Sequence, residues 1–136
     1  MDSARQAYER AAPGEHVIGW RVDADDRAAL LTHFVPRYPR TVADHVTLRA
    51  GVAADAAPPP TTVGVIVGRS DDSRGVEALV VHLEGGTDRP DGSSYHITWS
   101  LAEGREAIES NDVIRTRGWV VVEPPVPVRL EGARFP

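Results

Sequence analysis

The stretch TVGVIVG-RSDDSR-GVEALVVHL, residues 62–83, decides the fold class of this chain. Its two outer runs, 62–68 and 75–83, are rich in Val and other residues that favour strands. The residues between them, 69–74, are all polar or charged, which is typical of the connection in a β-hairpin. We therefore expect two antiparallel strands here, within a sheet that other strands of the chain extend.

Further strands are expected on both sides of this hairpin. After it, a loop at 84–94 rich in Gly, Asp and Ser separates two runs of strand character, and Pro124-Pro125 separates two more near the end of the chain. The five further runs are 17–22, 45–52, 95–101, 119–122 and 126–130. Together with the hairpin they make about seven strands.

Three segments favour short helices. Residues 2–12 suit a helix, and Asp23 is a suitable N-cap for a second one. Residues 103–117 are irregular to helical, with Ser110 as the expected N-cap and Gly118 as the expected stop. Strands that outnumber the helices, without regular alternation between the two, indicate an α+β domain rather than a doubly wound one.

Length and composition indicate one self-sufficient domain. The 136 residues leave no room for two domains, so we expect a single domain over 1–136, with 1–14 as an N-terminal helical extension. No apolar run approaches the roughly 18 residues that a membrane-spanning helix needs. The N-terminal residues lack the apolar stretch of a signal peptide. We expect a cytoplasmic protein without a membrane partner.

Charge and cysteine content narrow the classes of function. The formal net charge of −5 argues against binding long duplex DNA, because such binding is driven by clustered positive charge. All 15 basic residues are Arg, which is well suited to hold a single phosphate in a local pocket. The absence of Cys excludes disulfides, thiolate zinc sites and cysteine nucleophiles.

A tetrapeptide of the form His–apolar–Thr–apolar occurs twice. It reads His45-Val46-Thr47-Leu48 in the expected strand 45–52 and His96-Ile97-Thr98-Trp99 in the expected strand 95–101. Residues i and i+2 of a strand point to the same face. Each motif therefore places an imidazole and a hydroxyl side by side, with the apolar residues directed into the core behind them.

Two such pairs are suited to phosphodiester hydrolysis. One imidazole can activate water and the other can protonate the leaving oxygen, since His titrates near neutral pH, while the hydroxyls donate to phosphate oxygens. The alternative is that both motifs are the polar faces of half-exposed strands. A zinc site of His45 and His96 with Asp44 is disfavoured, because strand parity directs Asp44 to the other face.

Paired His-x-Thr motifs on strands resemble the signature of the 2H phosphoesterase superfamily. This superfamily includes bacterial and archaeal RNA 2′,3′-cyclic phosphodiesterases and the cyclic phosphodiesterase domain of fungal and plant tRNA ligases. The segment 104–114 is also similar to the tRNA-ligase branch, and the resemblance covers roughly residues 15–130. It implies two pseudo-symmetric antiparallel β lobes with a few short helices around a central cleft.

The resemblance also implies a function and a site. His45, Thr47, His96 and Thr98 would be the four catalytic residues of a hydrolase that needs neither metal nor cofactor. The substrate would be a 2′,3′-cyclic phosphate at an RNA 3′ end or in a small cyclic nucleotide, and the product a 2′-phosphate, as in RNA repair and processing. Which His is the acid stays open, with His96 as base the working assignment. The alternative is a binding module that holds a nucleotide or RNA end in the same pocket without turnover.

Five further residues are candidates for binding substrate. Strand parity continues the two motif faces to Arg49 and Ser100, which can offer donors to a phosphate. Thr87 and Arg89 lie in the long loop before the second motif and can reach a bound nucleotide. Tyr38 is a possible platform for stacking a base. The alternatives are a solvated Arg at the strand end for Arg49, an ordinary strand-terminal Ser for Ser100, and an ordinary exposed hairpin loop for Thr87 and Arg89.

Overall fold

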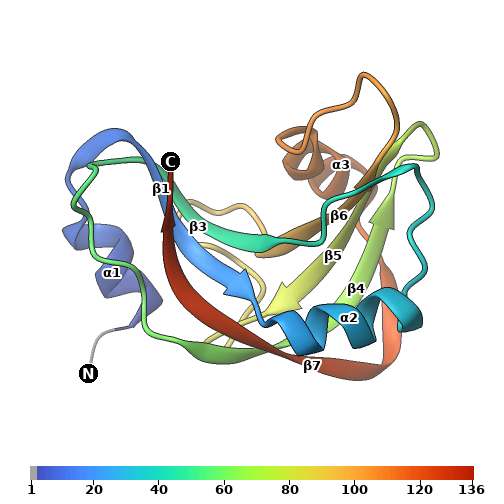
Figure 1. Ribbon diagram of the computed structural model, residues 1–136, viewed down its shortest axis with the longest axis horizontal. Helices are drawn as coiled ribbons and strands as arrows, with labels where there is room; N and C mark the ends of the chain where they lie inside the picture. The colour runs from blue at the N-terminus through green and yellow to red at the C-terminus, as the bar shows by residue number, and fades with distance from the viewer. Residues whose placement is uncertain (1–2) are drawn as a thin grey trace.

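One sheet of seven strands organises the computed structural model, which describes residues 3–136 (Figure 1). Its strand order is β2-β6-β3-β1-β7-β4-β5, and every pairing between these strands is antiparallel. The elements are α1 (Ala4–Arg10), β1 (Pro13–Val22), α2 (Ala24–His33), β2 (Arg40–Thr41), β3 (His45–Val52), β4 (Thr62–Asp71), β5 (Val76–His82), β6 (His96–Leu101), α3 (Glu109–Arg117) and β7 (Val120–Phe135). The expected α+β class is confirmed.

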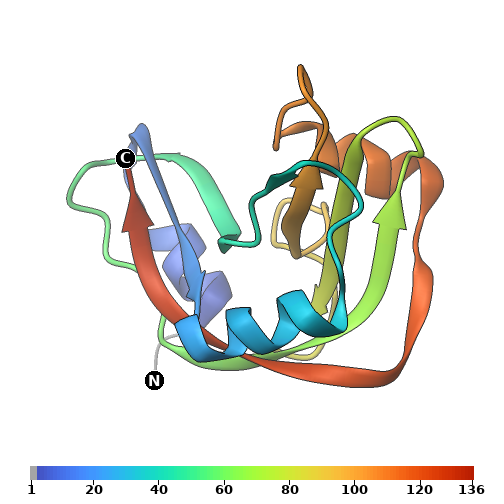
Figure 2. The same ribbon diagram turned by 45° about the vertical axis from the view of Figure 1, so that its right-hand side comes forward.

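An additional pairing between β5 and β6 closes six of these strands into a ring, with β2 attached outside it to β6. Figure 2 shows the strands as two arms, one with β1 and β3, the other with β4, β5 and β6. The arms are hydrogen-bonded to each other through β3 and β6 on one side and through β7 on the other. These two arms are therefore parts of one sheet.

β7 is the longest strand and belongs to both arms. It pairs with β4 along its first part and with β1 along its last part, running along the bottom of the view in Figure 1. Two separate strands were expected around Pro124-Pro125, but the chain continues as one. The prolines lie where the register with β4 shifts, between the pairs Ile66↔Val126 and Gly68↔Val121. Proline lacks an N–H and is tolerated in a sheet where the ladder is interrupted.

The helices begin and end largely where their capping residues predict. The Asp23 side chain accepts a hydrogen bond from the Asp26 N–H at 3.0 Å, which confirms it as the N-cap of α2. Gly118 ends α3 with a φ of 65°, a left-handed conformation that favours glycine. The prediction for Ser110 was wrong: α3 begins one residue before it, and the Ser110 side chain is buried instead of capping.

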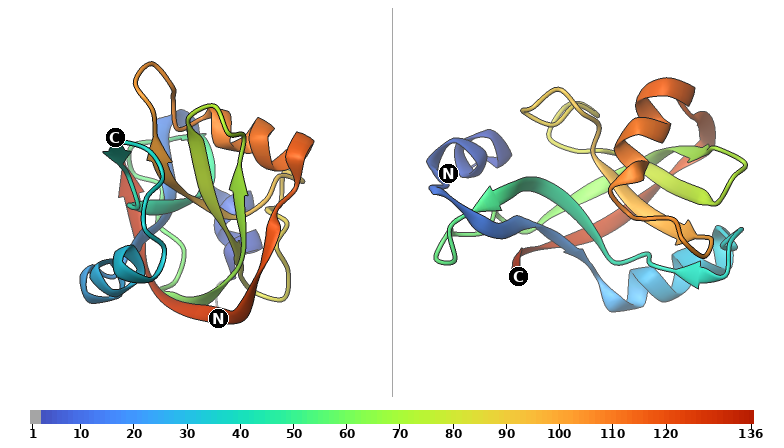
Figure 3. Two further views of the ribbon diagram at one scale, coloured as in Figure 1. Left: turned by 90° about the vertical axis from the view of Figure 1, so that its right-hand side faces the viewer. Right: turned by 90° about the horizontal axis from the view of Figure 1, so that it is seen from above.

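The N-terminal helix is part of the core rather than an extension of it. Ala4 and Ala7 of α1 are buried in the main apolar cluster, and β1 already begins at Pro13, inside the range expected to be an extension. Seen from above, α1 lies at one end of the molecule and α3 at the other (Figure 3). No helix among residues 3–136 combines the length and apolarity needed to cross a membrane.

A buried carboxylate connects the centre of the sheet to the loop before β2. Glu77 of β5 is fully buried, and its carboxylate accepts hydrogen bonds from Arg69 Nε at 2.7 Å and from Ser100 Oγ at 2.6 Å. The backbone N–H of Arg37 donates to the same group at 3.1 Å. A buried charge is tolerated when it is paired and hydrogen-bonded in this way.

Replacing this carboxylate tests its role in stability. In Glu77→Ala the Arg69 guanidinium loses its partner and Ser100 loses its acceptor, so we expect the free energy of unfolding to fall by about 3 kcal/mol. Urea denaturation measures this change. Glu103→Ala is the matched control, because Glu103 is exposed, and it should change stability by less than about 0.5 kcal/mol. Equal effects of the two substitutions would contradict the assignment.

Candidate active site

The pairing of β3 with β6 brings the two His-x-Thr motifs together. Val46 pairs with Ile97 in antiparallel register. The His and Thr of each motif flank this pair, His45 and Thr47 on β3 and His96 and Thr98 on β6, and the two strands run in opposite directions. Alternation along each strand puts these four side chains on the face opposite Val46 and Ile97, which are both fully buried.

These four side chains share one cavity of about 230 Å³. Four parts of the chain contribute to its wall: β3, β6, the loop between β5 and β6, and residues 107–111, which lead into α3 and include its start. The lining residues are His45, Thr47, Ala50, Arg89, His96, Thr98, Ala107, Ile108 and Asn111. Both motifs thus converge on one cleft, and Arg89 lies there with them.

His96 is held as a neutral imidazole. Its Nδ1 lies 2.9 Å from the carbonyl oxygen of Ser94, so Nδ1 carries the proton and donates, which leaves the Nε2 lone pair free. The residue is only 8% exposed. Burial, together with the positive charge of Arg89, lowers the pKa of His96 to about 4, although the Ser94 hydrogen bond opposes this shift.

His45 has a different environment. Its Nδ1 lies 3.1 Å from Asp44 Oδ2, and its ring packs on Phe135 with the centroids 4.9 Å apart. The side chain is about a third exposed. We expected strand alternation to direct Asp44 to the face opposite His45, and this was wrong. Asp44 lies before the first residue of β3, so strand alternation does not determine where its side chain points. A carboxylate at Nδ1 orients the ring and stabilises it when it carries a proton.

Among the described residues, Arg89 is the one arginine that lines this cavity. Its side chain is 10% exposed, and Nε donates to Ser93 Oγ at 2.7 Å while an ion pair joins it to Asp91 at 3.1 Å. A longer contact of 3.3 Å runs from Nη1 to the carbonyl oxygen of Thr47. These bonds fix the guanidinium beside the two motifs.

Two residues of α3 belong to the site although the sequence did not single them out for it. Ser110 Oγ lies 2.9 Å from Thr98 Oγ1, which fixes the second threonine hydroxyl. Asn111 lines the cavity, and its Oδ1 is buried with no hydrogen-bond partner among residues 3–136. Neither has a signal in the sequence, because their place depends on how α3 packs over the sheet. Asp44, in contrast, could have been identified from the sequence, because it immediately precedes the first motif.

Arg49 is not part of the cavity wall. Its guanidinium donates to the carbonyl oxygens of Tyr8 at 2.6 Å and of Ala11 at 3.2 Å, and it stacks on the Tyr8 ring at 4.7 Å. Arg49 therefore holds α1 and the residue after it against β3. The structure thus shows Arg49 neither lining the cavity nor as the solvated strand-end Arg that was the alternative, because α1 and the residue after it supply its partners.

Three more of the candidate residues lie outside the cavity. Ser100 is fully buried and donates to Glu77, and Tyr38 donates from its hydroxyl to Asp71 at 2.5 Å. The carbonyl oxygen of Thr87 accepts from the Tyr95 N–H, and the residue does not line the cavity. Of the five additional candidates, the structure brings only Arg89 to the two motifs.

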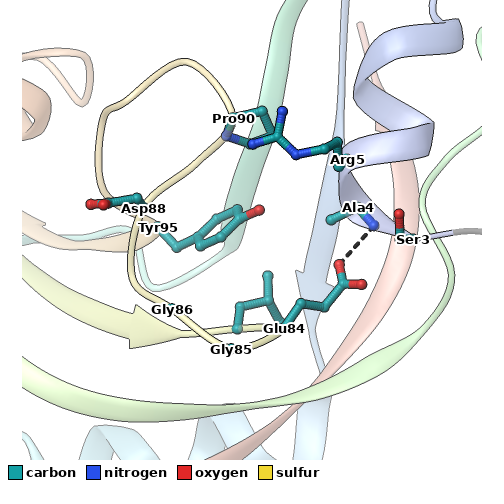
Figure 4. Close-up of a pocket in the computed structure, with 10 residues that line it drawn as sticks. Ser3, Ala4, Arg5, Glu84, Gly85, Gly86, Asp88, Pro90 and Tyr95 are labelled. Atoms are coloured by element: carbon teal, nitrogen blue, oxygen red, sulfur yellow. Dashed lines mark hydrogen bonds between the residues drawn. The ribbon is translucent and has the colours of Figure 1, made fainter.

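A separate cavity of about 380 Å³ lies between α1 and the loop that follows β5 (Figure 4). Glu84 accepts a hydrogen bond there from the Ala4 N–H at 2.7 Å, and burial raises the pKa of Tyr95 to about 12. No motif residue lines this cavity. Across residues 3–136, no three His, Asp or Glu side chains cluster as metal ligands.

Comparisons of the chain with models of protein families, with curated proteins and with solved structures find no match in any of the three. The chemistry of the site is therefore argued from its geometry. Two imidazoles in unlike environments, two hydroxyls and one fixed guanidinium surround a space of about 230 Å³. Such a set can supply a base, an acid and donors to a charged oxygen.

The buried His96 makes stability depend on pH. Unfolding returns its pKa from about 4 to the ordinary 6.5, so between these values the unfolded chain binds more protons than the folded one. Its contribution to the free energy of unfolding is therefore complete above pH 6.5 and falls as the pH drops toward 4. We expect the loss of stability between pH 7 and 4.5, measured by urea denaturation, to be smaller in His96→Asn by about 2–3 kcal/mol. Equal losses in both proteins would contradict a buried, neutral His96.

Proposed function

We propose that this chain is a phosphodiesterase of the 2H phosphoesterase type, which hydrolyses a 2′,3′-cyclic phosphate at an RNA 3′ end or in a small cyclic nucleotide. The observation that carries the proposal is the meeting of two His-x-Thr motifs, from neighbouring antiparallel strands, in one cavity. If the two motifs were only the polar faces of half-exposed strands, nothing would require both His–Thr pairs to line the same cavity. The product would be a 2′-phosphate, and the reaction would need no metal.

The unlike environments of the two imidazoles support a division of labour. His96 is neutral at physiological pH with a free Nε2, so it serves as the base that takes a proton from water. The water oxygen bonds to phosphorus as the bond from phosphorus to the 3′ oxygen breaks. His45, held at Nδ1 by Asp44, gives its Nε2 proton to the departing 3′ oxygen. Proton exchange with solvent then restores both rings.

The hydroxyls and the guanidinium stabilise the negative charge that develops on the phosphate. Thr47 and Thr98 donate to the two non-bridging oxygens, one from each strand. Arg89 adds a full positive charge that its bonds to Ser93 and Asp91 already hold in place, so little reorganisation is needed in the transition state. The same charge lowers the pKa of His96 and keeps the base neutral.

Removing either imidazole tests the proposal. His45→Ala and His96→Ala should each lower kcat for 2′,3′-cyclic AMP by at least about a hundredfold, the usual range for loss of a general acid or base. The assay follows formation of 2′-AMP by chromatography in the presence of EDTA. His82→Ala is the control, because His82 is an exposed residue of β5, and it should keep full activity.

Three outcomes decide the matter. Turnover that depends on both residues and withstands EDTA supports the proposal. A lack of turnover of any cyclic phosphate between pH 6 and 8 contradicts it. Binding of cyclic nucleotide by calorimetry without product would instead assign a binding module that uses the same pocket.

Arg89 offers a test of the assigned base. Because its charge lowers the pKa of His96, Arg89→Gln should raise this pKa and move the acid limb of the pH profile of kcat/KM to higher pH. Arg134→Gln removes an equal but exposed charge at the end of β7 and should leave the limb in place. An unmoved limb in Arg89→Gln, with activity still measurable, would contradict the assignment of His96 as base.

A further inference from the structure

A second cavity adjoins the candidate active site. It has a volume of about 420 Å³, within the range of sites that bind small ligands. Asn111 of α3 lines both cavities, and Ser94, which lines the second, accepts through its carbonyl oxygen the hydrogen bond from His96 Nδ1. The two cavities therefore share Asn111 as a lining residue, and the residue that orients His96 lines the second one.

Trp119 gives this second cavity an aromatic wall. It is 39% exposed, whereas Trp20 and Trp99 are fully buried. On its inner side the five-membered part of the indole packs against Gly68 of β4, where an added Cβ would lie 1.9 Å from the ring. Glycine at this position leaves room for the ring to lie against the strand. The indole is thus a supported platform with its remaining surface open to the cavity.

Asn111 offers hydrogen bonds that the fold does not use. Its Oδ1 is buried without a partner among the described residues, and its Nδ2 makes a single long bond of 3.5 Å to the Ile108 carbonyl oxygen. A buried acceptor left unpaired is costly, and a ligand that donates to it would remove this cost. A carboxamide presents both a donor and an acceptor, as the hydrogen-bonding edge of a nucleobase does.

We infer that the second cavity binds the base of the nucleotide whose cyclic phosphate lies between the two motifs. The base would stack on Trp119, and its polar edge would bond to the Asn111 carboxamide, since stacking accepts any base and the amide adds direction. This inference rests on the proposed function and adds a binding site for the base that those substrates carry next to the cyclic phosphate. A ribose 2,3-cyclic phosphate without a base would fill only the smaller cavity.

Kinetics on two substrates test the inference. The variant Trp119→Ala should raise KM for 2′,3′-cyclic AMP about tenfold with kcat nearly unchanged, because loss of base stacking weakens binding by roughly this factor or more. For methyl β-D-ribofuranoside 2,3-cyclic phosphate, which has no base, the variant should behave as the wild type. Trp119→Phe keeps an aromatic ring and should largely restore KM. Val121→Ala, an exposed neighbour on β7, is the control and should change nothing.

A binding measurement keeps this test separate from the proposed activity. Because Trp119 is the exposed tryptophan, 2′-AMP should quench the intrinsic fluorescence of the wild type, and inorganic phosphate should not. The quenching should be lost in Trp119→Phe. If no cyclic phosphate is hydrolysed but this quenching occurs, the proposed function fails and the base site stands. Equal KM values for cyclic AMP in wild type and Trp119→Ala, or quenching that survives in Trp119→Phe, would overturn the base site.

Discussion

Val46 of β3 and Ile97 of β6 pair across the sheet, and the arrangement of the site depends on this one antiparallel contact. A slip of one residue in either strand would turn its polar residues toward the core. Packing on the opposite face fixes the register. The residues on that face, Val46, Leu48, Ile97 and Trp99, are all fully buried. Packing on one face of the two strands thereby determines which polar side chains meet on the other face.

The same pairing places two chemically identical imidazoles in unlike surroundings. His96 is buried near Arg89 and stays neutral. His45 is the first residue of β3, is partly exposed and lies beside a carboxylate. The two motifs share one sequence pattern, but the loop before β6 and the residue before β3 give their histidines different surroundings. The proposed division into base and acid rests on this difference, since identical environments would give both rings the same protonation state.

Whether a polar residue near the motifs lines the cavity or bonds elsewhere in the fold depends on how distant segments pack against it. Ser100 continues the face of Thr98, yet the buried Glu77 of β5 takes its hydroxyl. Arg49 continues the face of Thr47, yet α1 offers it two carbonyl oxygens. Arg89, by contrast, lies in a loop of no regular structure and reaches the cavity because Asp91 and Ser93 hold it there. Strand parity predicts direction, whereas the partner that a side chain finds depends on the rest of the chain.

The sequence by itself determined the α+β class, most of the strands, the N-cap at Asp23, the stop at Gly118 and the shared face of each His-x-Thr pair. These features are local, because strand alternation and helix capping act over a few residues. Only the tertiary structure decided that β3 and β6 are neighbours, that β7 continues through its prolines and joins both arms, and that Ser110 and Asn111 of α3 reach the site. Those outcomes depend on contacts between residues far apart in the chain. Burial of apolar surface favours such contacts, and it depends on several segments packing together rather than on any single one.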